Sequence, residues 1–132
     1  WLVLPPDLIV RLLEQDLDFA GAIHALEHAS IGMMPLLSMC DRWDVGGVST
    51  PLHPDTGRAT IFVYDGYPGG AGIAEAGYHD ISRWQSMTLD AIRGCRCSDG
   101  CPACVHSPKC GNNNQPLDKA GAVYLLQRIL EG

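Results

Sequence analysis

The sequence predicts an α+β fold that is mostly helical, with a small antiparallel β-hairpin and a cysteine-rich loop. Apolar residues recur at helical spacing both before and after a single stretch of β-forming residues. Five of the six cysteines lie between positions 95 and 110. A chain of 132 residues can bury one modest core, so we assign residues 1–132 to a single domain.

Two helices are predicted before the hairpin. Pro5, Pro6 and Asp7 are typical of a helix start, because proline is tolerated in the first turn and an acidic side chain is favourable there. The apolar residues that follow form the stripe of this first helix. Asp18 is a suitable N-cap for a second, longer helix that carries apolar residues at helical spacing as far as Leu37.

The hairpin is predicted from an extended stretch, a turn and a strand, at 43–52, 54–57 and 59–64. A glycine-rich loop follows it. Three further helices are then expected: 73–78, 81–92 and a last one after Pro116.

The clustered cysteines are Cys95, Cys97, Cys101, Cys104 and Cys110. Thiolates spaced this closely can converge on one tetrahedral Zn²⁺, and Pro102 favours the turn that brings Cys104 back toward Cys101. A disulfide scaffold or a redox pair explains the pattern less well, because neighbouring cysteines are poorly placed to bridge each other and a redox pair needs no further thiols. We therefore predict a structural zinc site made of four cysteines, and the spacing leaves open which four of the five bind. Cys40 has no partner at ligand spacing and is expected to lie outside the site.

The formal net charge of −6 argues against a general nucleic-acid binder, because phosphate contacts require clustered cations. The cations near the cysteines are Arg93, Arg96, His106, Lys109 and Lys119. Our preferred interpretation is that they offset the negative charge of the metal centre. The alternative is a local contact with DNA phosphates through Arg93, Arg96, Lys109 and Lys119.

The sequence also indicates the cellular compartment of the protein. No apolar run approaches the roughly 20 residues that span a membrane, and no secretory signal is visible. Many thiols without such a signal indicate a reducing, cytoplasmic setting. The first residue, Trp1, is not a methionine, which suggests a fragment of a longer protein.

Two further motifs have a functional and a structural interpretation. His24, Glu27 and His28 match the H-x-x-E-H arrangement of inverted zinc peptidases, so a small zinc metallopeptidase is an alternative function. Packing on an amphipathic helix explains the same residues, and the sequence offers no clear third ligand. We therefore expect that replacing both histidines leaves the zinc content unchanged.

The glycine-rich loop at 65–72 could cradle a phosphate, but it lacks the pattern of a nucleotide-binding loop and is better explained as a tight turn.

Together, the glycine-rich stretch 64–72 and the cysteine run 95–104 resemble the MrfA-type zinc-binding (MZB) domain, found at the C-terminus of a group of superfamily 2 DNA helicases. The stretches 24–35 and 40–53 resemble the mycobacterial-type branch of those helicases. The resemblance covers nearly the whole chain.

This resemblance implies a zinc-binding accessory module of an ATP-dependent 3′-to-5′ DNA helicase that acts in DNA repair. The family's four metal cysteines match Cys95, Cys97, Cys101 and Cys104, and Cys110 is an additional thiol and a possible alternate ligand. The module itself would have no catalytic activity. It would brace the ATP-binding motor domains of the same polypeptide or guide DNA. A protein-interaction module with no DNA role is a further alternative.

Overall fold

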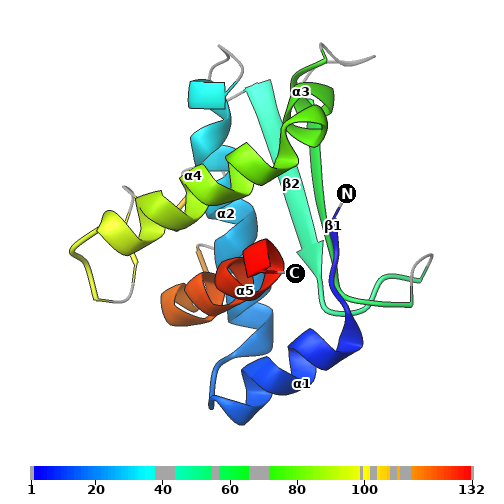
Figure 1. Cartoon of the computed structure of the whole chain (residues 1–132), viewed down its shortest axis with the longest axis vertical. Helices are drawn as coiled ribbons and strands as arrows, with labels where there is room; N and C mark the ends of the chain where they lie inside the picture. Colours follow the sequence, from blue (N-terminus) through cyan, green and yellow to red (C-terminus); the bar gives the residue numbers. More distant parts are fainter. Residues whose placement is uncertain are drawn as a thin grey trace.

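The computed structural model (Figure 1) describes residues 2–37, 44–54, 57–65, 72–98, 100–101, 104–107, 110 and 114–131. Within these ranges the elements follow the order β1 (Leu2–Val3), α1 (Pro6–Glu14), α2 (Phe19–Leu37), β2 (Val45–Thr50), β3 (Thr60–Asp65), α3 (Ile73–His79), α4 (Ile81–Gly94) and α5 (Lys119–Glu131). Helices dominate and the strands are antiparallel, which confirms the predicted α+β class.

The predicted hairpin is present, and a short third strand extends it. β2 pairs with β3 from Val45 opposite Asp65 to Thr50 opposite Thr60. β1 pairs with the other edge of β3, so the strand order is β1-β3-β2. The two residues of β1 were not predicted, because a pairing of that length leaves no alternating pattern in the sequence.

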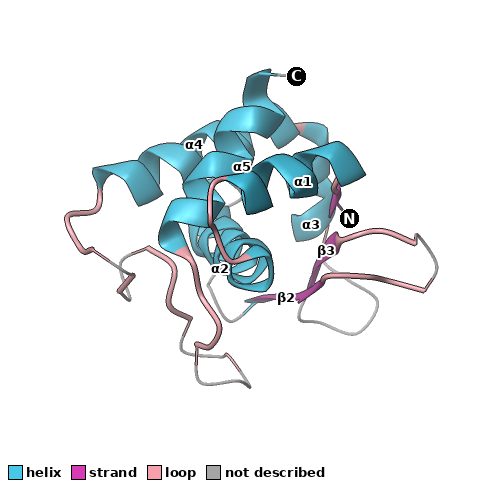
Figure 2. Ribbon diagram, turned by 90° about the horizontal axis from the view of Figure 1, so that it is seen from below, coloured by secondary structure: helices cyan, strands magenta, loops and turns pink. Residues whose placement is uncertain are grey.

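The helix α2 forms the centre of the domain. Figures 1 and 2 show it passing beneath α4 and α5 and alongside the sheet. Its own buried residues include Ala22, Leu26, His28 and Met34, as expected for a helix covered on most sides. The main core forms where α2 meets α1, α4 and α5, and a smaller cluster that includes Val45 and Trp84 lies toward the end of α2.

The beginning of α5 is tied to the beginning of α2 through Asp118. Its carboxylate accepts hydrogen bonds from the backbone N–H of Gly121, at 2.9 Å, and of Asp18, at 2.8 Å. The backbone N–H of Asp118 in turn donates to the Gly21 carbonyl at 2.9 Å. These bonds cap α5 and hold the segment that precedes it against α2.

No helix in the described ranges is both long and apolar enough to cross a membrane.

Candidate metal centre

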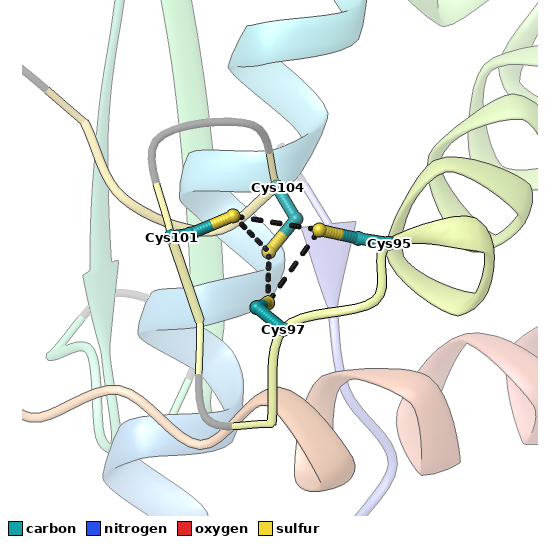
Figure 3. A group of neighbouring side chains, drawn as sticks. All are labelled: Cys95, Cys97, Cys101 and Cys104. Carbon is teal, nitrogen blue, oxygen red and sulfur yellow. Dashed lines mark hydrogen bonds between the residues drawn. The ribbon is translucent and has the colours of Figure 1, made fainter.

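Four cysteine sulfurs meet at the end of α4 (Figure 3). The Sγ atom of Cys95 lies 3.5 Å from that of Cys97 and 3.4 Å from that of Cys101. The Sγ atom of Cys104 lies 3.4 Å from that of Cys97 and 3.9 Å from that of Cys101. All four ligand atoms lie within 4.8 Å of one another. The sulfurs therefore surround a common point instead of forming separate pairs.

Local backbone geometry brings these four sulfurs close together. Cys95 follows α4 directly with an extended backbone, so the chain leaves the helix at the first ligand. Gly100 has a φ of +125°, which side-chain-bearing residues rarely adopt, and a Cβ at this position would lie 2.6 Å from Val105. The Cys101 carbonyl then accepts the backbone N–H of Cys104 at 3.0 Å and that of His106 at 3.1 Å, which closes a turn between the third and fourth sulfur.

Lys119, at the start of α5, directs its ammonium group at this cluster. Its Nζ donates to the carbonyls of Cys95 and Cys97 at 3.0 and 2.6 Å, and to the Sγ of Cys97 at 3.1 Å. This contact lowers the pKa of Cys97 from its ordinary value of 9.0 to about 6. Burial has the opposite effect on Cys104 and raises its pKa to about 12. The contact with Lys119 thus favours the thiolate form of Cys97 at neutral pH, whereas burial favours the protonated form of Cys104.

The other predicted cations lie differently. The side chains of Arg93 and Arg96 are exposed at the end of α4 and just after it. Lys109 and Cys40 lie outside the described residues. Lys119 therefore contacts the cysteine cluster, whereas Arg93 and Arg96 face solvent.

The helix that follows the glycine-rich loop has its N-terminus capped by Asp65. The Asp65 carboxylate accepts backbone N–H groups from Gly72, Ile73 and Ala74 at 2.8, 3.3 and 2.7 Å. Residues 66–71 of the loop lie outside the described residues. The N–H groups that a phosphate would use at this helix are bonded to a carboxylate of the chain itself.

Cys110, the fifth cysteine of the run, lies apart from the four sulfurs. Its Sγ is 3.5 Å from the Nε2 of His24, and together with His28 these residues form a second group with ligand atoms within 4.8 Å of one another. Glu27 is buried beside them, and burial raises its pKa although hydrogen bonds with Ser49 partly offset this. This grouping was not predicted from the sequence, because 86 positions separate Cys110 from His24.

Comparison with known proteins gives a family match and several relatives. The family described as the MrfA Zn-binding domain matches residues 26–105, a stretch that contains all four clustered cysteines and ends before Cys110. An uncharacterised protein of Methanocaldococcus jannaschii is 38% identical over 113 residues, which cover 82% of this chain and 99% of that protein.

Two larger proteins are also similar. The ATP-dependent helicase YprA of Bacillus subtilis is 40% identical over 99 residues, 75% of this chain and 12% of the helicase. The crystal structure of the DUF1998 helicase MrfA bound to DNA superimposes with a TM-score of 0.67 at 29% identity, covering 96% of this chain and 15% of that one. The chain thus spans only 12–15% of the length of these helicases, but nearly the whole of the archaeal relative.

Proposed function

The chain belongs to the MrfA Zn-binding domain family, and from this premise we propose that it is the structural zinc module of a DNA helicase. The parent would be an ATP-dependent 3′-to-5′ helicase that acts in DNA repair, with this module at its C-terminus. The observation that carries the proposal is the four-sulfur cluster, which lies inside the stretch matched by the family. Clustered thiols of this kind stay reduced in the cytoplasm, where we place the protein.

The cluster fits a zinc ion closely. Four sulfurs at about 2.3 Å from a shared Zn²⁺ stand about 3.8 Å apart in a regular tetrahedron. The four short Sγ–Sγ distances range from 3.4 to 3.9 Å, so only small shifts of the side chains are needed. We therefore assign Cys95, Cys97, Cys101 and Cys104 as the ligands. A fully occupied set of four sulfurs leaves no position for water or substrate, which indicates a structural ion.

The ammonium group of Lys119 should make zinc binding more resistant to acid. Zinc binds the thiolate, so a cation that lowers the pKa of Cys97 reduces the competition from protons. Because this pKa falls from 9.0 to about 6, the stabilisation is complete above pH 9, decreases below it and is lost as the pH falls through about 6. Lys119→Met should raise the pKa of Cys97, and the midpoint of acid-induced zinc release should move to higher pH.

A chromogenic chelator that reports zinc release between pH 7 and 4 would measure this midpoint. Arg93→Met removes an exposed cation near the cluster and should leave the midpoint unchanged. Equal midpoints for Lys119→Met and the unaltered chain would show that the lysine does not tune the site.

The module would support a motor that lies elsewhere in the polypeptide. The sequence has no Gly-Lys-Ser/Thr phosphate loop, and Asp65 occupies the described N–H groups at the start of α3. ATP binding and hydrolysis would therefore belong to the motor domains, which this module braces or for which it guides DNA. Any phosphate contact would come from Arg93 and Arg96, joined by Lys109, whereas Lys119 would add to the local field from within the cluster.

The test is a comparison of the full-length helicase with and without residues 1–132. We expect the truncated protein to lose DNA unwinding and to retain basal ATP hydrolysis, because the nucleotide site is not in this module. The isolated module should not hydrolyse ATP. Unwinding at the intact rate, or hydrolysis by the module alone, would contradict the accessory role.

A second candidate function is a stand-alone zinc module that binds another protein and has no DNA role. The archaeal relative favours it, because this chain accounts for 99% of that protein. Titration of the chain with short duplex and single-stranded DNA at several salt concentrations separates the two candidates. Binding that weakens as salt rises, and that is reduced in an Arg93→Met/Arg96→Met variant, favours the helicase module. No binding at low salt favours the protein-interaction module.

A further inference from the structure

A second group of metal-ligating side chains is centred on α2 and is separate from the four-sulfur cluster. It consists of His24 and His28, one helical turn apart, and Cys110 from the segment that precedes α5. We propose that these three side chains bind a second divalent transition-metal ion, for which Zn²⁺ is the best match. The proposal is independent of the four-sulfur site, and two of its three residues lie outside the stretch matched by the family.

Both imidazole rings are already oriented for metal binding. The Nδ1 of His24 donates to the Pro116 carbonyl at 2.7 Å, and the Nδ1 of His28 donates to the Val105 carbonyl at 2.8 Å. A carbonyl oxygen can only accept, so the proton of each neutral ring must sit on Nδ1. The Nε2 atom of each ring then carries the lone pair that a metal requires. A hydrogen bond from the other ring nitrogen is also the usual second-shell partner of a metal-bound histidine.

The distances and the donor set agree with this assignment. The Sγ of Cys110 lies 3.5 Å from the Nε2 of His24. A nitrogen at about 2.0–2.1 Å and a sulfur at about 2.3 Å from one tetrahedral zinc are about 3.6 Å apart. The two imidazole rings lie edge to face with their centroids 4.2 Å apart, which keeps the second nitrogen within reach of the same point. Two imidazoles and one thiolate are ligands that borderline-soft ions such as Zn²⁺ prefer.

The three side chains also line a cavity of about 340 Å³ between α2 and β2. Gly47 of β2 belongs to its wall, and a Cβ there would lie 2.7 Å from Ile31 and 2.9 Å from the Phe62 carbonyl, so the strand can run this close to α2 only with glycine. Glu27 lines the same cavity with 6% of its surface exposed. Three protein ligands leave a fourth position on the ion, which a water molecule in this cavity would fill.

A metal at this position would fasten Cys110 to the central helix. The two histidines already bond to the carbonyls of Pro116 and Val105, and Cys110 lies between these two residues in the sequence. Val105 directly follows Cys104, the last ligand of the four-sulfur site. The proposal replaces the sequence-based expectation that the histidine pair has no role in zinc content, because the fold supplies the third ligand that the sequence did not reveal.

The test is the metal stoichiometry of the 132-residue chain after saturation with Zn²⁺ and removal of excess, measured by elemental analysis against protein concentration. We expect two ions per chain. The variants His24→Gln/His28→Gln and Cys110→Ser should each bind one ion, and His79→Gln, which alters an exposed histidine on α3, should still bind two. Circular dichroism confirms that each variant is folded.

Cobalt substitution provides a measurement that does not depend on any variant. Co²⁺ in a four-sulfur site and Co²⁺ with two nitrogens and one sulfur absorb differently, so the unaltered chain should fill two spectroscopically distinct sites in the titration. A chain that saturates at one ion with a purely four-sulfur spectrum would overturn the proposal, and the contact between Cys110 and His24 would then be a thiol–imidazole hydrogen bond. A second ion that persists in the double histidine variant would overturn it as well.

Discussion

Cys101→Ser is expected to release the zinc of the four-sulfur site and to unfold at least the C-terminal third of the chain. Cys101 contributes one of the four sulfurs, and its carbonyl accepts two hydrogen bonds within the turn that presents Cys104. A serine hydroxyl is a much poorer zinc ligand than a thiolate at neutral pH. In small domains the free energy of structural zinc binding, on the order of 10 kcal/mol, is also folding free energy. The free energy lost with this ligand should therefore exceed the total stability of a domain of this size.

Zinc content and circular dichroism of the purified variant measure this effect. Cys110→Ser is the matched control, because Cys110 belongs to the same cysteine run and lies apart from the four sulfurs. This control should retain the four-sulfur zinc and the helical signal. Stoichiometric zinc in the four-sulfur site of Cys101→Ser would refute the ligand assignment. Cys110→Ser removes a ligand of the proposed second site alone, so the comparison tests the four-sulfur assignment whether or not the second site binds a metal.

Leu26→Ala should destabilise the domain by about 2–5 kcal/mol, the range observed when a buried leucine is truncated and a cavity is left. Leu26 is 1% exposed, in the middle of α2, where the main core forms between this helix, α4 and α5. Helices packed on several sides of α2 leave little freedom for the surroundings to collapse into the vacated volume. A total stability of about 5–15 kcal/mol is typical of domains, so the variant should be severely weakened.

Urea denaturation of the zinc-loaded chain, followed by circular dichroism, measures the change. Leu36→Ala is the matched control, because it makes the same substitution in the same helix at a position that is 69% exposed. It should alter the free energy of unfolding by no more than about 0.5 kcal/mol. Similar losses for both variants would contradict the central position of α2 in the core.

The sequence was sufficient for features that depend on local spacing. The helices begin close to their predicted positions, at Pro6, after Asp18 and after Pro116, because capping residues and apolar periodicity act within a few residues. The hairpin could also be predicted from the sequence, because its turn separates two stretches rich in β-forming residues. The four clustered cysteines lie within ten positions of one another, so backbone turns alone bring their sulfurs together.

Only the tertiary structure decided which distant groups meet these local features. Lys119 reaches the Sγ of Cys97 across 22 positions, and Asp65 caps a helix that begins eight residues later. The spacing of the five cysteines could not separate Cys110 from the other four, and it could not show that Cys110 lies beside His24, 86 positions away. Contacts of this kind are set by how α2, α5 and the sheet pack around one core. Residue spacing along a chain carries little information about such packing, because many arrangements of the same helices would satisfy the same local patterns.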